Sequence, residues 1–375
     1  MLTLWQWVVA FRFPLHQPAT PVPGTNPPVT LLKPLKGIDE KTLESLESWL
    51  KQAYSGEVEV LFGVAAEDDP VCKPVTELLA RHPKANTRLV ICPENLGANA
   101  KVSTLIQLMR LARHEIIMVS DADVWAPAAT INELVQPLKD PSVGLVNCFY
   151  HLSTASNFAM RWEAFAVNAD FWSQVLQSQS LKPNDFALGA VMATTRQRLA
   201  AIGGFESLAD YLADDYQLGH KIARTGARIV LARIVVECRS DTMDWKEVWS
   251  HQLRWARTIC VCQPVPFFLS QIHNPTLWPL LWMALQPTST VLAIAAAGLL
   301  TRGLTGFYCN RKLTRRADLN AFWLAPIKDL LQTSIWSLAF FRKKVHWRGQ
   351  TFFVRSGGKL ERTSGGVRSG PVASG

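Results

Sequence analysis

The sequence predicts an α/β fold with a mostly parallel sheet and helices on both faces, followed by C-terminal membrane helices. Between residues 29 and 120, short apolar runs alternate with stretches of helical periodicity, which is typical of repeated strand–helix units. From Pro264 onward the chain changes to long apolar stretches. The composition agrees, because 48% of the 375 residues are hydrophobic and only 18% are charged. This balance favours a protein that keeps part of its apolar surface in lipid.

The first 28 residues are predicted to be a short apolar N-terminus and a Pro-rich linker. Residues 1–13 are apolar but shorter than the roughly 20 residues that cross a bilayer. They lack a basic start and a small-residue cleavage site, so a signal peptide is not indicated. We expect this segment either to lie in the membrane interface or to be the remnant of a longer anchor. Residues 14–28 are rich in Pro and Thr and are predicted to be a linker.

Residues 29–262 are predicted to form the catalytic domain. Its first half contains four expected strands, at 29–32, 58–65, 87–92 and 115–120. Expected helices separate them, the first ending at Gln52 and capped by Asp39, then 71–81 and 101–113. In parallel sheets, ligands bind beyond the carboxyl ends of the strands. Two acidic turns follow such ends, so both are expected to face one crevice.

Residues 263–345 are predicted to be membrane-associated helices, and 346–375 a C-terminal segment with a flexible Gly/Ser-rich tail. Apolar stretches cover 267–286, 288–308 and 321–341. Pro275, Pro279 and Pro287 are expected to kink or divide the first, and Lys328 and Asp329 interrupt the third. The basic segments 309–320 and 342–348 both favour the cytoplasmic side of a membrane. Three full crossings cannot satisfy both, whereas a hairpin followed by a re-entrant or interfacial third segment can. The sequence therefore predicts a multi-pass or partly re-entrant membrane protein whose catalytic domain faces the cytoplasm.

The net charge of +9 is concentrated near the C-terminus. Between Arg302 and Arg362 there are 13 Lys or Arg residues against 3 Asp or Glu. Because these basic residues flank apolar helices, they indicate anionic lipid head groups rather than nucleic acid. The 7 cysteines form no CxxC pair and are expected to be reduced, with neither a zinc site nor a disulfide framework.

Asp121-Ala122-Asp123 follows the last of the four strands. Two aspartates one residue apart suit a hard divalent cation, Mg²⁺ or Mn²⁺, and a nucleotide. A solvated acidic turn is the structural alternative. Earlier in the chain, Asp68 and Asp69 end another strand in the same manner and are candidates for nucleotide binding, or for a turn before Pro70.

Three further motifs carry candidate chemistry. Lys101 lies at the start of an expected helix. Its ammonium is expected either to bind a phosphate or to be exposed to solvent. Asp215, next to Asp214, is a candidate base for an acceptor hydroxyl, although both aspartates also suit a helix N-terminus. The third motif is Gln252-Leu253-Arg254-Trp255, in which Arg suits a diphosphate and Trp a sugar or a lipid. An interfacial helix with a snorkelling Arg and an anchoring Trp is the alternative.

Read in order, these motifs resemble an inverting glycosyltransferase of the GT-A fold in family 2, closest to ceramide glucosyltransferase and the hopanoid-associated bacterial enzymes. The resemblance covers roughly residues 29–360. The quoted sequence elements that carry it are Leu32-Lys33-Pro34-Leu35-Lys36-Gly37, Asp68-Asp69-Pro70, Asn99, Lys101, Asp121-Ala122-Asp123, Asp214-Asp215-Tyr216, the (Q/R)xxRW signature at Gln252-Leu253-Arg254-Trp255, His346-Trp347-Arg348-Gly349 and Gly357-Gly358. The chain departs from the family at Ala65-Ala66, where Gln-Asp is common, so which of Glu67, Asp68 and Asp69 reads the nucleotide stays open.

The resemblance implies UDP-sugar binding by Asp69, Lys101 and Asp121, with a divalent cation held by Asp121 and Asp123. It makes Asp215 the catalytic base and places Arg254 and Trp255, with Gln252 in the same signature, over the diphosphate and acceptor. Gly189 falls where the family has a glycine near the acceptor.

The implied reaction is hexose transfer, most often of glucose, to the hydroxyl of a bilayer lipid such as ceramide, giving a β-linked glycolipid. Transfer of N-acetylglucosamine to a hopanoid polyol and a processive polysaccharide synthase are alternatives within the enzyme class. A non-catalytic nucleotide-sugar-binding membrane protein is the alternative outside it.

Overall fold

The computed structural model describes residues 2–18, 26–153, 157–341, 344–347, 350–354 and 356–362. The expected linker at 14–28 lies partly outside these residues, as does the basic segment at 342–348. The expected flexible tail after Arg362 lies wholly outside them.

The core of the molecule is an eight-stranded sheet in the order β3-β2-β1-β4-β7-β6-β8-β5. Its strands are β1 (Val29–Pro34), β2 (Val58–Val64), β3 (Asn86–Ile91), β4 (Ile116–Ser120), β5 (Val124–Trp125), β6 (Val143–Leu152), β7 (Val191–Thr195) and β8 (Arg228–Cys238). The first four strands are parallel to one another. Beyond β4 the sheet is mixed, since β7 runs antiparallel to β4 and β6, while β6 and β8 are parallel. The predicted α/β class is confirmed, with its parallel part in the N-terminal half.

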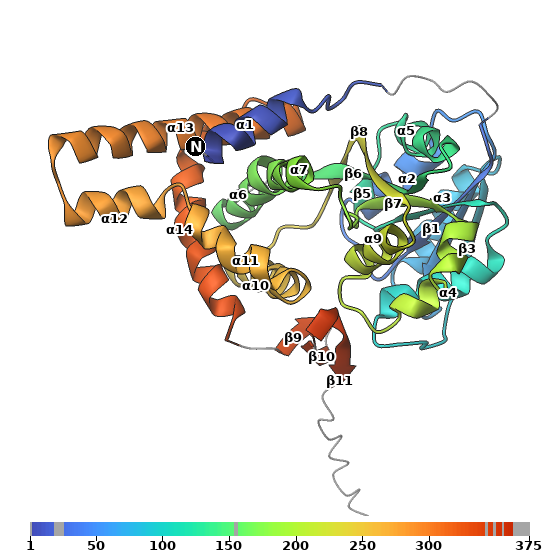
Figure 1. Cartoon of the computed structure of the whole chain (residues 1–375). Helices are drawn as coiled ribbons and strands as arrows, with labels where there is room; N and C mark the ends of the chain where they lie inside the picture. Colours follow the sequence, from blue (N-terminus) through green and yellow to red (C-terminus); the bar gives the residue numbers. More distant parts are fainter. Residues whose placement is uncertain are drawn as a thin grey trace, which may run out of the picture.

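Helices cover both faces of this sheet, as expected (Figure 1). One face packs against α2 (Thr42–Leu50), α3 (Cys72–Arg81) and α5 (Thr130–Val135), and the other against α4 (Ala100–Leu111) and α9 (Asp214–Arg224). Successive residues of a strand point to opposite faces, so Leu31 joins the first cluster and Leu32 the second. Burial on both faces explains why the strands read as continuous apolar runs.

One expected helix cap is wrong. Helix α2 begins at Thr42 after Lys41, and no side chain caps it. The backbone N–H of Asp39 instead donates to Thr42 Oγ1 at 2.8 Å, and the Asp39 carbonyl accepts the Thr42 N–H at 3.1 Å. Asp39 therefore shapes the turn before the helix through its backbone.

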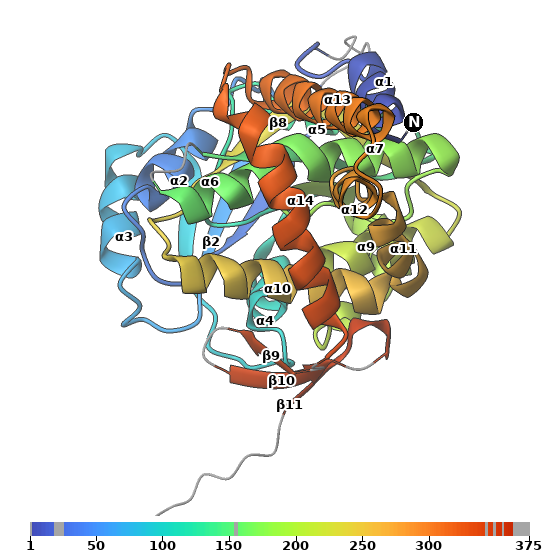
Figure 2. The same ribbon diagram turned by 90° about the vertical axis from the view of Figure 1, so that its left-hand side faces the viewer.

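A second layer of helices lies beside the sheet. It contains α1 (Leu2–Arg12), α6 (Phe158–Phe165), the π-helix η2 (Ala166–Phe171), α7 (Trp172–Leu181), α10 (Trp245–Cys262) and α14 (Asn320–Ala339). Helix α1 runs beside α13 (Ser289–Thr314), and Figure 2 shows α14 crossing over α6 and α10. Gln6 of α1 donates to Ser173 Oγ at 2.8 Å, which ties the N-terminal helix to α7.

The expected membrane stretches are only partly correct. Within the described residues, only α13 is long and apolar enough to cross a membrane. The stretch 267–286 divides into α11 (Pro264–Ser270), a short turn and α12 (Leu277–Leu285), because Pro275 interrupts it and Asn274 Oδ1 accepts the N–H groups of Thr276 and Leu277. In α14, both Lys328 and Asp329 are buried in ion pairs with the rest of the protein. Neither stretch is therefore a simple crossing.

The described C-terminal residues form a small antiparallel sheet below α10 (Figure 2). It consists of β9 (Lys344–Trp347), β10 (Gln350–Val354) and β11 (Leu360–Arg362), with the turn η5 (Ser356–Gly358) between the last two.

Candidate active site

The site is organised around Lys101, whose ammonium joins two acidic motifs far apart in the sequence. Its Nζ lies 2.6 Å from Asp121 Oδ1 and 3.1 Å from Asp214 Oδ2. Lys101 is buried, and the two carboxylates raise its pKa despite that burial, so it stays charged. The ion pairs bring the turn after β4 and the first turn of α9 together.

Asn99 sets the position of Lys101. Its Oδ1 caps α4 by accepting the N–H groups of Lys101 and Val102 at 3.0 and 3.2 Å. Its Nδ2 donates to the carbonyl of Tyr211 at 2.9 Å, so the same side chain fixes the loop ahead of α9. Lys101 was expected to meet phosphate or solvent; the structure assigns its ammonium to two carboxylates.

Asp214 and Asp215 lie in the first turn of α9 but neither caps it, because the N-cap residue is Ala213. The cap alternative is therefore wrong, although both carboxylates still face the positive end of the helix. Asp214 is buried against Lys101. Burial, assisted by the charge of Asp214 and opposed by Lys101, raises the pKa of Asp215 to about 6. Asp215 thus has the basicity that general base catalysis near neutral pH requires.

Lys33 was not among the candidates, yet it lies directly behind the Asp121 turn. Its Nζ donates to the Asp121 carbonyl at 2.6 Å and to Ser120 Oγ at 3.1 Å, and it sits 5.1 Å from the ring centre of Trp49. Complete burial lowers its pKa to about 7. The sequence feature that could have indicated its role is the presence of a lysine within the apolar run of β1.

The Asp121–Asp123 pair fits a divalent cation. Burial and the neighbouring Asp121 charge raise the pKa of Asp123 to about 6, so this turn carries repulsion that a cation would relieve. In the described part of the chain, no group of three or more His, Cys, Asp or Glu side chains is placed to hold a metal ion. A cation here would therefore be held by the two aspartates together with oxygens of a diphosphate, which is the arrangement typical of Mg²⁺.

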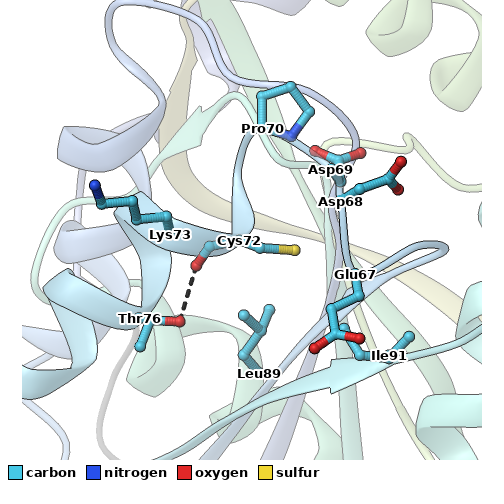
Figure 3. A pocket seen from close by; sticks show the side chains of 9 residues that line it. All are labelled: Glu67, Asp68, Asp69, Pro70, Cys72, Lys73, Thr76, Leu89 and Ile91. Atoms are coloured by element: carbon cyan, nitrogen blue, oxygen red, sulfur yellow. Dashed lines mark hydrogen bonds between the residues drawn. The ribbon is translucent and has the colours of Figure 1, made fainter.

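The acidic turn after β2 borders a cavity of about 580 Å³ (Figure 3). Its lining comprises Glu67, Asp68, Asp69, Pro70, Cys72, Lys73, Thr76, Leu89 and Ile91. Asp69 accepts the N–H groups of Gly37 and Val71, both at 3.0 Å, whereas Asp68 is exposed. Because β2, β1 and β4 are parallel neighbours, the acidic turn after β2 and the Asp121 turn after β4 lie at the same end of the sheet.

The predicted Gln252-Leu253-Arg254-Trp255 motif lies on α10, which begins with a capping box formed by Asp244 and Glu247. Gln252 is buried, and its Nε2 donates to Glu163 Oε1 at 2.9 Å. Arg254 and Trp255 are half-buried. The end of α10 reaches α9, because Gln263 Nε2 donates to the hydroxyl of Tyr216 at 2.8 Å.

The described C-terminal residues bind both α9 and the loop that precedes it. Gln217 Nε2 donates to the Gly357 carbonyl at 2.8 Å, and the N–H of Leu212 donates to the Gly358 carbonyl at 3.1 Å. Both glycines have positive φ, 76° and 84°, which accounts for the paired glycines in the sequence. In the sequence, only the family resemblance indicates this pair of glycines.

The structure is similar to a mannosyltransferase from Pyrobaculum calidifontis solved with GDP-Man and Mn²⁺, with 22% identity, coverage of 88% of this chain and 94% of that chain, and a TM-score of 0.55. This likeness shows the GT-A fold. In sequence, the chain is 23% identical over 229 residues to ceramide glucosyltransferase 1 of Caenorhabditis elegans, covering 60% of this chain and 48% of that protein. It is 29% identical over 122 residues to ceramide glucosyltransferase of Komagataella phaffii, covering 32% and 24%.

The chain thus spans about half the length, or less, of the curated relatives it matches. The resemblance to ceramide glucosyltransferases is confirmed, but the family model that matches, over residues 1–360, is Glycosyl transferase family 21 and not the expected family 2. This protein therefore belongs to glycosyl transferase family 21.

Proposed function

We propose that this protein transfers a hexose, glucose in the first instance, from a UDP-sugar to the hydroxyl of a membrane lipid of the ceramide type, with inversion. The family and the ceramide glucosyltransferase relatives support glycosyl transfer to a lipid. The observation that carries the proposal is the Lys101 bridge, which puts a nucleotide-type acidic turn and a separate carboxylate in one crevice. Such a pairing is what a single displacement needs.

In the proposed reaction, Asp215 acts as the base. It takes the proton of the lipid hydroxyl while the oxygen attacks the anomeric carbon. The bond from that carbon to the UDP oxygen breaks on the opposite face, so the product is β-linked and UDP leaves with the electron pair. Asp214 is unsuited to this role because Lys101 already holds its carboxylate.

The leaving diphosphate develops charge that the protein must stabilise. A Mg²⁺ or Mn²⁺ ion held by Asp121 and Asp123 would neutralise part of that charge. Arg254, on α10, offers a planar set of donors suited to phosphate oxygens, and Trp255 an apolar surface for the sugar or the lipid. Gln252 fixes this helix through Glu163. Asp68 and Asp69 line the cavity after β2, in which the nucleoside of the UDP-sugar would bind.

Membrane association is part of the proposal. The relatives act on ceramide by name, and one described helix is long and apolar enough to cross a membrane. An enzyme held at the membrane leaves the acceptor chains in lipid, so that only the head group enters the crevice. The catalytic domain is proposed to face the cytoplasm, where the basic segments belong.

The test uses purified protein, detergent-solubilised ceramide and UDP-glucose, with the lipid product identified by mass spectrometry. Asp215→Asn should remove turnover while the protein stays folded. The matched control is Asp140→Asn, an exposed carboxylate paired with Arg228, which should keep full activity. Near-normal turnover of Asp215→Asn would remove this residue from the role of base.

A panel of donors and acceptors separates the alternatives. UDP-galactose, UDP-N-acetylglucosamine, a hopanoid polyol and host lipid extract are offered in turn. A single glucose on ceramide supports the proposal. Product formed only from UDP-N-acetylglucosamine and the hopanoid polyol would indicate the hopanoid-modifying alternative instead. A long polymer would indicate a polysaccharide synthase, and nucleotide binding without UDP release would indicate a non-catalytic binding protein.

A further inference from the structure

Helices α12 and α13 form a hairpin that projects from the body of the protein on the side away from the sheet (Figure 1). From Pro275 to Thr301 the chain has 27 consecutive residues without Asp, Glu, Lys or Arg. None of the residues of α12 is buried. The large exposed apolar side chains of the hairpin are Trp278, Leu281, Trp282, Leu285, Leu292, Ile294 and Leu300.

A single carboxylate marks where both legs of the hairpin leave the body. Asp329 of α14 accepts a hydrogen bond from Thr276 Oγ1 at 2.6 Å, just before α12 begins. It also accepts two from Arg302 of α13, at 2.9 and 2.8 Å. Arg302 is 2% exposed and donates two more bonds to Asp170 of the catalytic part, at 3.0 and 2.7 Å. The two legs therefore emerge at the same level.

Beyond Arg302, most of α13 is packed against protein, and Leu304 is the large apolar side chain that stays exposed. A Cβ at Gly303 would lie 2.5 Å from the ring of Phe322, and one at Gly306 would lie 2.8 Å from Phe165. Cys309 on the same helix is fully buried. Most of the second half of α13 is thus packed against α14 and the catalytic part, and the first half offers the longer stretch of lipid-accessible surface.

The free lengths are too short for a crossing. The 9 residues of α12 span roughly 14 Å, and the 13 residues from Ser289 to Thr301 roughly 20 Å, against a hydrocarbon core of about 30 Å. Helices of these lengths would extend about as far as the middle of a bilayer. The helix α13 as a whole has the length and composition of a membrane span, but much of its second half is engaged by α14 and the catalytic part.

We propose that the α12–α13 hairpin inserts into the hydrocarbon of one leaflet as a re-entrant anchor, so that both ends of the hairpin and the whole catalytic part stay on one side of the membrane. This inference deepens the proposed function and rests on it for the identity of the acceptor. Lipid is the occupant because the charge-free hairpin is followed by Arg311, Lys312, Arg315 and Arg316, which complement anionic head groups.

The topology is tested by placing a cysteine at the hairpin tip. Gln286→Cys lies in the turn between α12 and α13, and Lys84→Cys is an exposed control on the catalytic part. The full-length protein is added to preformed phosphatidylcholine–phosphatidylglycerol vesicles. A membrane-impermeant maleimide is supplied either outside or encapsulated, and each labelled peptide is quantified by mass spectrometry.

The inference requires that Lys84→Cys is labelled from outside and Gln286→Cys from neither side. A fluorophore attached beforehand to Gln286→Cys should be quenched more by nitroxide deep in the acyl chains than by nitroxide at the head groups. Labelling by the encapsulated reagent would overturn the inference in favour of a crossing. Labelling of Gln286→Cys from outside would overturn the inference in favour of a hairpin exposed to water. Protection of Gln286→Cys without depth-dependent quenching would overturn it in favour of a hairpin covered by protein.

A charge at the tip separates this inference from the proposed function. Leu285 is 79% exposed, and Leu285→Asp should lower vesicle binding at least about tenfold, while activity on a short-chain, water-soluble ceramide is retained. Leu111→Asp, on the exposed end of α4, should bind vesicles normally. Unchanged vesicle binding by Leu285→Asp would contradict the anchor. Absence of any glucosylated ceramide with an intact anchor would contradict the proposed function alone.

Discussion

Gly189 lies directly against the carboxylate of Asp215. A Cβ at position 189 would be 2.5 Å from Asp215 Oδ2, closer than nonbonded atoms approach. The loop that leads into β7 therefore has no side chain at this point because the proposed base occupies the space. The family resemblance places both residues near the acceptor.

Gly189→Ala should displace Asp215 and lower kcat by about a hundredfold, because a base misplaced by about 1 Å loses that much. The KM for the UDP-sugar should change little, since Asp121 and Lys101 are untouched. Steady-state kinetics measures both. Gly226→Ala is the control: its φ of 87° makes the substitution strained, but open space surrounds it at the far end of α9. It should lower the melting temperature and leave kcat unchanged; equal kcat losses in both variants would indicate general destabilisation.

The pH profile should report the raised pKa of Asp215. A base works only when ionised, so kcat/KM should rise as the pH increases through about 6 and level off above it. The charge of Asp214 contributes to the raised pKa, so Asp214→Asn should move the acidic limb to lower pH. The measurement is kcat/KM from about pH 5 to pH 8. A limb that stays in place or moves to higher pH in Asp214→Asn would argue against Asp215 as the group that titrates.

Lys33→Met should weaken cation binding. It removes the donor that holds the Asp121 carbonyl, and with it the support of the turn that carries Asp121 and Asp123. Loss of such an outer-sphere partner typically costs about 10–100-fold in metal affinity. Titration of activity with Mn²⁺ measures this, with Lys51→Met as the exposed control. An unchanged Mn²⁺ requirement in Lys33→Met, with only lower thermal stability, would limit Lys33 to a structural role.

Cys72 should report occupation of the cavity beside Asp68 and Asp69. Its thiol points into the space between α3 and the acidic turn in Figure 3, and it is partly accessible. Burial raises its pKa, so alkylation should be slow near neutral pH and faster in alkaline buffer. UDP with Mn²⁺ should protect Cys72 but not Cys260, as followed by peptide mass spectrometry. Equal rates with and without UDP would place the nucleoside elsewhere.

Much of the first half of the fold was predictable because its signals are local. Expected strands such as 58–65 and 115–120 differ from β2 and β4 by a single residue at one end. The antiparallel strand β7 and the long strands β6 and β8 were not predicted. Their pairing depends on contacts between distant segments, and nothing in a short window of sequence reports it.

The membrane region shows the opposite case. Length and composition were right for α13, yet they could not reveal that Arg302 is bound to Asp170 and Asp329, 132 and 27 residues away. An apolar composition indicates that a helix is shielded from water. It does not distinguish shielding by lipid from shielding by protein, because both are apolar surroundings. Only the packed structure distinguishes the lipid-accessible half of the helix from the half that faces protein.

The sequence by itself determined the α/β class, the chemical types in the site and their order along the chain, because local patterns of polarity and short motifs encode them. Tertiary structure alone decided which groups meet. Lys101 binds Asp121 and Asp214, which makes Asp214 unsuited to act as the base. Lys33 donates a hydrogen bond to the Asp121 carbonyl and so supports the turn. These assignments depend on distances between segments about 20 to 110 residues apart, set by the burial of apolar surface on both faces of the sheet.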